Sequence, residues 1–288
     1  MNKIFTPKKL LKDQLSLEGD IVAISGGGGF LGLYFAEAIA EYGGIPLLLD
    51  INKEGIKKNL EALKENEYKC FGFECDVSDA QAINSIVPEI IKEHKKIDVL
   101  INAVNFVGVN PSNFKDNDNP YFAKIENYSE ELWEQSLKLN LTGTFLLTQK
   151  IGQLMAKRQS GSIINLASDV GVISPDHRIY QSDHENDYEG TNFNTPMSYS
   201  VSKAGIIQMT KYLATYWADQ GIRVNAISPA GVENSHSDAF RKKLTNLIPL
   251  GRMASPEELK GPIVFLASDA SSFITGSNLI VDGGRTIW

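Results

Sequence analysis

The chain contains 288 residues, 42% of them hydrophobic, and carries a formal net charge of -7. This length and hydrophobic content suit one large domain with a substantial core. The acidic balance argues against a surface that binds nucleic acid or an anionic membrane. Because the opening stretch MNKIFTPKKLLKDQL holds lysines but no long apolar run, we expect neither a signal peptide nor a membrane anchor in it. A cytoplasmic protein is expected from the two cysteines described below, which cannot pair and so fit a reducing compartment.

Helix-like and strand-like segments alternate along the chain after an N-terminal leader at residues 1–17, in which we expect a short helix. The elements predicted first are a strand at 21–24, a glycine turn at 25–32, a helix at 30–42, a strand at 47–49, a helix at 53–64, a strand at 69–75, a helix at 79–94 and a strand at 97–102. The polar stretch 105–127 is rich in Asn and Asp and is predicted to be a loop.

The alternation continues to the end of the chain, interrupted by a second polar stretch at 174–195. The remaining predicted elements are a helix at 129–157, a strand at 162–166, a helix at 195–219, a strand at 222–227, a helix at 256–268 and a strand at 278–281. This order predicts an α/β fold, a Rossmann-type doubly wound parallel sheet of about seven strands with helices on both faces. We expect one domain over 18–288, with insertions near 105–127 and 174–195.

The turn between the first strand and the first long helix has the pattern of a dinucleotide site. It reads SGGGGFLG, and Gly27, Gly29 and Gly32 satisfy the G-x-G-x-x-G template. Glycines let the chain turn tightly and let the backbone approach a pyrophosphate at the helix N-terminus. The cofactor-binding residues predicted here are Ser25, Gly26, Gly27, Gly28, Gly29, Phe30 and Leu31.

Asp50 follows the second strand, about twenty residues after the turn, where an acid can hydrogen-bond the adenosine ribose. Its carboxylate would repel a 2′-phosphate, and the turn holds no Arg or Lys to bind one. Lys53 is the one nearby cation that complicates this interpretation, and we interpret it as a solvated residue of the helix's first turn. The sequence therefore favours NAD(H) over NADP(H).

Tyr199 and Lys203, in the run YSVSK, stand one helical turn apart and share a face of a predicted helix. A cation held there favours the phenolate and should lower the pKa of the tyrosine towards working pH. Tyr and Lys at this spacing are common by chance, so the pair gains meaning from the dinucleotide site upstream.

The cysteines and histidines predict neither a disulfide nor a metal site. Cys70 and Cys75 fall on one predicted strand with an odd separation. The two side chains should therefore point to opposite faces, which prevents their pairing. The four histidines show no metal-ligand spacing, so we expect no bound metal.

Taken together, these motifs resemble the single-domain branch of the short-chain dehydrogenase/reductase superfamily, from about residue 17 to the end. The matching residues are Asp76 in CDV, Asn140 in KLNLTGTF, Ser168 in INLASD, the Tyr199–Lys203 pair and Pro229 in SPAGV. The resemblance implies hydride transfer between nicotinamide and a carbonyl or secondary alcohol. It also implies cofactor contacts from Asp76, Val77, Asn102, Ala103, Tyr199, Lys203, Pro229, Ala230, Gly231 and Val232.

The same resemblance assigns roles to a catalytic set of Asn140, Ser168, Tyr199 and Lys203. Tyr199 would be the general acid in reduction and the general base in oxidation. Lys203 would lower the pKa of that phenol and bind the nicotinamide ribose. Ser168 would hold the substrate oxygen near the phenol, and Asn140 would sit at a helix kink that anchors a water feeding protons to Lys203.

Three departures from the family pattern bear on the substrate. The glycine turn resembles that of the extended branch of nucleotide-sugar epimerases and dehydratases, although only 85 residues follow Lys203, too few for that branch's substrate domain. The family's Asn-Asn-Ala-Gly motif reads NAVN, ending at Asn105. Ser168 precedes Tyr199 by 31 residues, against about a dozen in the family, so an insertion lies beside the serine.

The insertion and Asn105 are the predicted substrate contacts, with His177 and Arg178 named within the insertion; the alternative is a solvated surface loop. Arg178 could pair with a phosphate or carboxylate. Phrases such as LATYWADQGIRVNAISPAGV resemble the flagellin modification protein A group, which is assigned to sugars of flagellar or other surface glycans. The resemblance thus implies a sugar oxidoreductase.

Two other functions and the state of assembly stay open at this point. One alternative is an epimerase or dehydratase that recycles bound NAD, and the other is a non-catalytic protein that senses the cofactor. By resemblance we expect a homotetramer or homodimer formed through the helices at 129–157 and 195–219 and the last strand.

Overall fold

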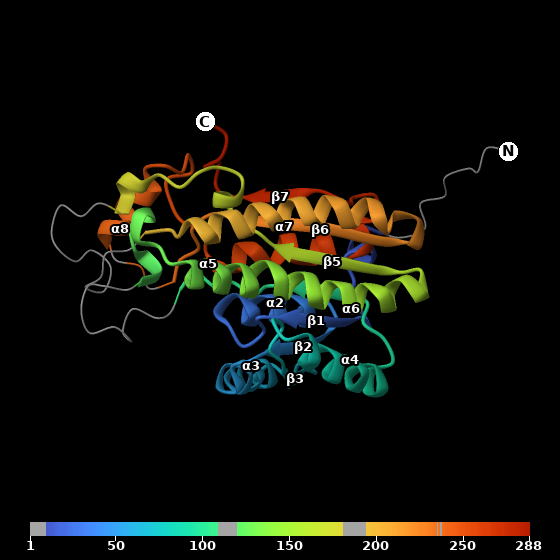
Figure 1. Cartoon of the computed structure of the whole chain (residues 1–288). Helices are drawn as coiled ribbons and strands as arrows, with labels where there is room; N and C mark the ends of the chain where they lie inside the picture. The colour runs from blue at the N-terminus through green and yellow to red at the C-terminus, as the bar shows by residue number, and fades with distance from the viewer. Residues whose placement is uncertain (1–9, 109–119, 181–193, 235, 237) are drawn as a thin grey trace.

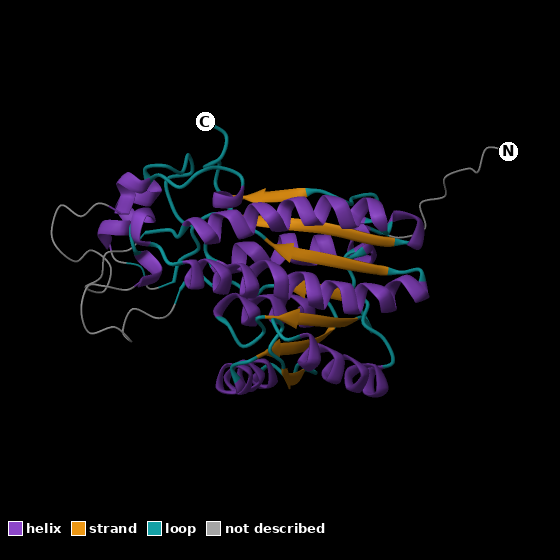
Figure 2. Ribbon diagram, viewed as in Figure 1, coloured by secondary structure: helices purple, strands orange, loops and turns teal. Residues whose placement is uncertain are grey.

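The computed structural model describes residues 10–108, 120–180, 194–234, 236 and 238–288. In this part of the chain one parallel sheet has the strand order β3-β2-β1-β4-β5-β6-β7 (Figure 2). The strands are β1 (Ile21–Ser25), β2 (Ile45–Asp50), β3 (Phe71–Glu74), β4 (Val99–Asn102), β5 (Gly161–Leu166), β6 (Ile222–Pro229) and β7 (Asn278–Val281). The predicted doubly wound parallel sheet is confirmed.

Helices cover both faces of the sheet (Figure 1). They are α1 (Leu11–Gln14), α2 (Phe30–Glu41), α3 (Lys53–Glu65), α4 (Ala80–His94), α5 (Glu130–Leu137), α6 (Gly143–Arg158), α7 (Met197–Tyr216), α8 (Asp238–Thr245) and α9 (Lys260–Ala267). None of the helices in the described ranges is long and apolar enough to cross a membrane.

Two hydrophobic cores, one on each face, hold the helices to the sheet. In β1, Val22 and Ile24 face the core formed with α2, α3 and α9, whereas Ala23 faces the core formed with α4, α6 and α7. Every residue of β1 is buried, as expected for a strand covered on both faces. We call these the α2–α3–α9 core and the α4–α6–α7 core.

The strand order reverses between β1 and β4, because β2 and β3 lie on one side of β1 and β4 to β7 on the other. At such a switch point the connections leave in opposite directions and open a crevice at the carboxyl ends of the strands. Asn102 at the end of β4 supports this point from within the sheet, since its Nδ2 donates to Thr148 Oγ1 and Asn165 Oδ1, both at 2.8 Å.

The structure corrects three details of the predicted elements. The single helix predicted over 129–157 is α5 and α6, joined by a π-helical turn at Lys138–Thr142. Helix α8 was not predicted, because it spans only two turns and its apolar residues contact distant segments. The loop predicted at 105–127 contains 3₁₀ turns at Pro120–Phe122 and Ile125–Asn127. Residues 109–119 and 181–193 of the two predicted insertions lie outside the described residues.

Leu17 and the two cysteines lie in the hydrophobic cores. Leu17, the last residue of the predicted leader, is fully buried in the α2–α3–α9 core. Cys70 packs in the same core and Cys75 in the α4–α6–α7 core, as their odd separation predicts, and both thiols are free.

Candidate active site

The glycine turn after β1 is pressed against the end of β4. Gly26 has a φ of +71°, and a Cβ there would lie 2.7 Å from the carbonyl oxygen of Ala103, so a side chain is excluded on two grounds. Asn59 of α3 fixes the turn from beneath, with Nδ2 donating to the carbonyls of Gly27 at 2.8 Å and Gly29 at 3.0 Å. The sequence analysis missed Asn59, a polar residue 4% exposed on an otherwise apolar helix face.

The turn leads into the N-terminus of α2, where Gly29 is the N-cap residue and no described side chain caps the helix. The first amides of a helix have no intrahelical partner, and together they attract an anion. Phe30 and Leu31 of this turn line the adjoining cleft. The geometry therefore suits a pyrophosphate.

Asp50 is held rigidly at the end of β2. Its Oδ2 accepts from the Gly28 amide at 3.0 Å and its Oδ1 from the Asn52 amide at 2.9 Å. Lys53 turns to Glu74, with Nζ 2.7 Å from Oε2, an exposed ion pair that is weak in energy but fixes where the cation points. The carboxylate thus faces the cleft, and the lysine is engaged elsewhere.

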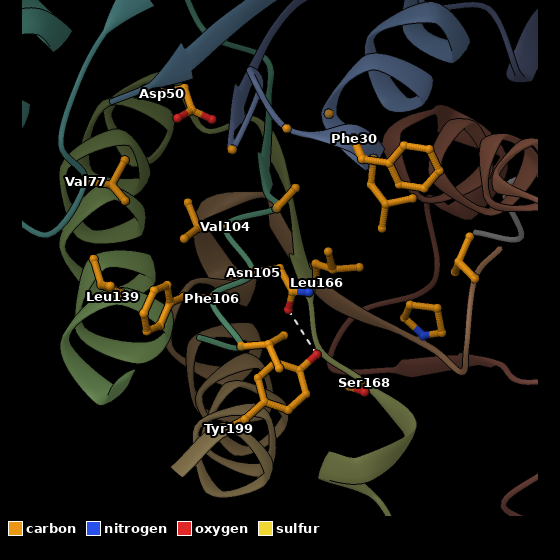
Figure 3. A pocket seen from close by; sticks show the side chains of 18 of the residues that line it. Phe30, Asp50, Val77, Val104, Asn105, Phe106, Leu139, Leu166, Ser168 and Tyr199 are labelled. Carbon is orange, nitrogen blue, oxygen red and sulfur yellow. Dashed lines mark hydrogen bonds between the residues drawn. The ribbon is translucent and has the colours of Figure 1, made fainter. Parts of the chain in front are cut away.

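A single cleft of about 840 Å³ runs from Asp50 to Tyr199 along the carboxyl edge of the sheet (Figure 3). The predicted cofactor contacts that line it are Gly26, Gly29, Phe30, Leu31, Asp50, Asp76, Val77, Ala103, Tyr199, Pro229, Ala230 and Val232. The predicted contacts not found among its described lining residues are Ser25, Gly27, Gly28, Asn102, Lys203 and Gly231. Some residues of the second group hold the cleft in shape from behind: the Gly28 amide binds Asp50, and Asn102 binds Thr148 inside the sheet.

Lys203 lies beneath Tyr199 on α7, and both side chains are buried. Its Nζ donates to the Leu166 carbonyl at 2.9 Å and lies 5.5 Å from the centroid of the tyrosine ring. Burial lowers the pKa of Lys203 to about 7, because a charged ammonium loses its hydration there.

Tyr199 does not have the lowered pKa that the sequence predicted. Burial of the phenol raises its pKa above the ordinary value, since the phenolate would lose hydration. The ammonium of Lys203 is directed to the Leu166 carbonyl and does not outweigh that cost. The phenol instead donates to Asn105 Oδ1 at 3.0 Å, the bond drawn in Figure 3, and a hydrogen bond with Ser168 offsets part of the rise in its pKa.

Asn140 occupies the π-helical turn between α5 and α6, so the helix irregularity that the family resemblance implied is present. Its side chain binds the backbone of Phe106 twice, accepting from the amide at 2.8 Å and donating to the carbonyl at 2.7 Å. Asn140 therefore holds the segment after β4 against the site. Its link to Lys203 through a water stays a prediction.

Ser168 is backed by a buried ion pair that the sequence analysis missed. Its Oγ donates to Asp169 Oδ1 at 2.9 Å, and Asp169 Oδ2 is paired with Arg285 Nη1. The aspartate and arginine side chains are 6% and 5% exposed. An acid inside the buried run INLASDV was the available signal, but its partner lies 116 residues away.

The predicted substrate residues separate into two groups. Asn105 lines the cleft and contacts Tyr199. His177 and Arg178 are not among the cleft's described lining residues. Arg178 is 82% exposed and forms a two-pronged pair with Asp176, which satisfies the guanidinium locally. His177 Nδ1 lies 3.1 Å from Asn194 Oδ1.

Part of the cleft wall comes from the segment after β6, which supplies Asn234 and His236. The His236 ring stacks on Phe240 of α8 at 5.5 Å, and Phe240 stacks on Tyr180 at 5.9 Å. Burial lowers the pKa of His236 below its ordinary value, which favours the neutral ring. These residues were missed because only the undetected helix α8 brings them to the cleft.

The two ends of the cleft define the class of protein. An anion-attracting helix start and a fixed carboxylate fit the pyrophosphate and adenosine ribose of a dinucleotide. At the other end Ser168 and Tyr199, with Lys203 beneath, present the proton-transferring groups that a hydride exchange requires. The fold and the site are those of a dinucleotide-dependent oxidoreductase.

Comparison with known families agrees with this class. The family model described as short chain dehydrogenase matches residues 20–182, and that described as enoyl-(acyl carrier protein) reductase matches residues 188–286. The chain belongs to the short-chain dehydrogenase family, and it is an oxidoreductase. The two matches meet within the predicted insertion before Tyr199.

Characterised relatives align over nearly the whole chain. The NAD-dependent glycerol dehydrogenase of Listeria innocua is 34% identical, covering 93% of this chain and 94% of the relative. The NADP-dependent mannitol dehydrogenase of Alternaria alternata is 33% identical and covers 96% of each. The post-translational flagellin modification protein A of Campylobacter coli is 32% identical, covering 93% of this chain and 98% of the relative.

Solved structures show the same architecture. A short-chain dehydrogenase from Leptospira borgpetersenii with bound NAD⁺ superimposes with a TM-score of 0.80 at 31% identity, covering 99% of both chains. The named relatives include users of NAD and of NADP, so similarity alone leaves the choice of cofactor to the residues around Asp50.

Proposed function

We propose that this protein is an NAD(H)-dependent oxidoreductase that interconverts a secondary alcohol and a carbonyl on a polyol or sugar derivative. One observation carries the proposal: a single cleft joins a fixed carboxylate, Asp50, to the hydrogen-bonded pair Ser168 and Tyr199. The glycerol and mannitol activities named for two relatives support the substrate class.

The adenosine end supports NAD over NADP. The backbone amides of Gly28 and Asn52 each bind one oxygen of Asp50, which leaves further lone pairs to accept from ribose hydroxyls. A 2′-phosphate would meet this carboxylate at close range. Lys53 is engaged by Glu74, so it offers little compensation.

At the reacting end, bound NAD(H) accepts or supplies the hydride. Tyr199 removes the proton of the alcohol during oxidation and returns it to the carbonyl oxygen during reduction. Ser168 lies within hydrogen-bonding reach of the phenol and positions the substrate oxygen beside it. Lys203, once protonated, favours the phenolate from beneath the ring.

The substrate end of the cleft combines polar and apolar lining. Asn105, Asn234 and His236 supply hydrogen-bonding groups, whereas Phe106 and Phe122 supply ring faces. Such a lining suits a small polyhydroxylated molecule. Similarity to the Campylobacter coli flagellin modification protein A supports a sugar of a surface glycan as the natural substrate.

The test is turnover of glycerol, D-mannitol, sugar phosphates and nucleotide sugars with NAD(H) and NADP(H), followed at the nicotinamide absorbance. We expect NAD(H) to be preferred by at least ~tenfold in kcat/KM, because one charge-assisted hydrogen bond contributes ~1.5–3 kcal/mol. Asp50→Ala should partly relax that ratio, and Glu74→Gln is the control that frees Lys53. Equal use of both cofactors by the parent would refute the preference.

The alternatives left open by the sequence have distinct outcomes in the same assay. Cofactor retained through purification, with product formed and no net NADH, would indicate an epimerase or dehydratase. Unchanged turnover in Tyr199→Phe would instead remove the catalytic assignment and favour a cofactor-sensing protein.

We further propose a cytoplasmic homotetramer or homodimer. The outer faces of α6 and α7 expose Phe145, Val201, Tyr212 and Tyr216, and the last two rings stack at 6.3 Å. Exposed apolar and aromatic side chains on the helices expected to form the interface suit a self-association surface. Light scattering at micromolar concentration should report a dimer or larger, and a monomer would refute the proposal.

A further inference from the structure

A buried carboxylate lies directly behind the catalytic serine. Asp169 follows Ser168 at the carboxyl end of β5, and its Oδ1 accepts both the serine hydroxyl at 2.9 Å and the amide of Val170 at 2.8 Å. Its Oδ2 is paired with Arg285. Because an ionised carboxylate can only accept, the hydrogen bond to Ser168 uses the serine's own proton.

Arg285 reaches Asp169 from a rigid turn after β7. Asp282 closes this turn, since its Oδ1 accepts from the amide of Gly284 at 2.8 Å and its Oδ2 from that of Thr286 at 2.7 Å. Gly283 and Gly284 have φ values of +63° and +90°, a backbone that residues other than glycine rarely adopt. The arginine is therefore delivered to a fixed point.

Stability alone does not account for this pair. The desolvation of two buried charges offsets most of their attraction, and apolar residues of similar size often serve a core equally well. Arg285 Nε is also buried without a hydrogen-bond partner in the described part of the chain, an additional cost. The contact of the pair with Ser168 therefore suggests a role in the site rather than in stability.

We propose that Asp169 and Arg285 are positioning residues that fix the Ser168 side chain beside Tyr199. The Asp169 carboxylate holds the serine oxygen at one point of the cleft, and the Arg285 guanidinium holds the carboxylate. From that point the serine hydroxyl can turn to the substrate oxygen with which Tyr199 exchanges a proton. The proposal rests on the catalytic role of Ser168 and Tyr199 given above.

The deciding experiment is a double-mutant cycle on kcat/KM, with NAD(H) and the best substrate of the panel. The charge-neutral variant Asp169→Asn/Arg285→Met removes both charges, which avoids leaving one of them buried alone. We expect it to fold cooperatively, to bind NADH with the parental Kd in a fluorescence titration, and to lose at least ~tenfold in kcat/KM. In a Ser168→Ala background the same two substitutions should change kcat/KM by less than ~twofold.

Two controls separate positioning from structural damage. Arg285→Lys keeps the charge beside Asp169 and should recover most of the lost kcat/KM. Asp98→Asn/Arg158→Met makes the same substitutions in an ion pair at the opposite edge of the sheet, and kcat/KM should stay within ~twofold of the parent.

Three outcomes would overturn the proposal. They are parental kcat/KM in the charge-neutral variant, an equal loss in the parental and Ser168→Ala backgrounds, and failure of the charge-neutral variant to fold while Arg285→Lys folds with parental kcat/KM. The last would show a purely structural pair. Parental turnover in Ser168→Ala or in Tyr199→Phe would instead refute the assigned chemistry, and the positioning role with it.

Discussion

The two edges of the sheet each hold an Asp–Arg pair, in very different surroundings. At the amino edge Asp98 Oδ1 lies 2.5 Å from Arg158 Nη2, while its Oδ2 accepts from the Ile21 amide at 2.9 Å. This partly exposed pair joins the starts of β1, β4 and β5. At the carboxyl edge Asp169 and Arg285 are buried and contact Ser168.

The difference shows how location decides what an ion pair does. At the amino edge, water solvates part of each charge, so the pair costs little and holds strand ends together. At the carboxyl edge the Asp169–Arg285 pair is withdrawn from water, so its burial costs stability. Enzymes commonly sacrifice stability in this way where activity needs it.

The largest effect should come from Tyr199→Phe at the carboxyl edge. Without the phenolic oxygen no group remains to exchange the substrate proton, so kcat/KM should fall about 10³-fold, within the range for a lost general acid–base. The free energy of unfolding should change by less than ~1 kcal/mol, because the ring stays in place. Parental kcat/KM in a correctly folded variant would contradict the assignment of the catalytic groups to the carboxyl edge.

The next effect concerns the buried Lys203 and the pH dependence of stability. Its pKa is about 7 in the folded protein against 10.5 when unfolded, so the unfolded chain binds more protons between these values. Stability should then rise with pH across that window. Relative to Lys203→Met, the cofactor-free parent should gain about 2 kcal/mol in free energy of unfolding between pH 7 and 9.

Denaturant titrations at each pH check this gain. The difference between parent and variant is the quantity to compare, since other groups titrate equally in both. A difference that does not change with pH would show that the lysine keeps its proton in the folded state.

At the amino edge, Arg158→Met should lower the free energy of unfolding by about 1–2 kcal/mol and leave kcat/KM within ~twofold. The arginine donates to the Ile97 carbonyl at 2.7 Å as well as pairing with Asp98. Arg252→Met is the matched control, because Arg252 and Glu258 form a more exposed pair and should contribute less than ~1 kcal/mol. A large loss of turnover in Arg158→Met would contradict the view that the pair at the amino edge serves stability and not activity.

The smallest effect should be a gain from Asp20→Asn. Burial and the neighbouring Asp98 raise the pKa of Asp20 to about 6, so the folded protein loses stability as pH rises from about 4 to 6. The substitution should remove that loss and add about 1 kcal/mol at pH 7, less than the full shift implies because the group is half exposed.

Thermal unfolding at pH 7 and at pH 4 measures the Asp20 effect. The two proteins should converge at pH 4, where the carboxyl is protonated in the parent. Stabilisation of equal size at both pH values would point to packing rather than charge.

Much of the fold and half of the site could be predicted from local patterns. Alternating segments predicted the parallel sheet, and short motifs located Asp50, Ser168 and Tyr199, because each function depends on residues close in sequence. The sequence did not show that Asp169 meets Arg285, since 116 residues separate them. Helix α8 was missed for the same reason, as its apolar contacts come from distant segments.

Two expectations from side-chain chemistry meet local surroundings that the sequence did not show. Arg178 was expected in the substrate site, and in the structure Asp176, two residues earlier, binds its guanidinium, so its contact with substrate stays a prediction. The lowered pKa expected for Tyr199 required Lys203 to act on a solvated phenol, whereas burial dominates both groups. The spacing of two residues in the sequence can predict that their side chains lie close together, but the burial of those side chains decides their charge state.

The reactivity of the two cysteines can report local unfolding around strand β3. Cys70 and Cys75 flank β3, the edge strand, and each is buried in a different core. Burial raises the pKa of both thiols, that of Cys75 to about 11, so the reactive thiolate is scarce until the edge strand separates. Alkylation rates of the two thiols, compared site by site, would therefore reveal whether the layers on the two faces of the sheet loosen together or in turn.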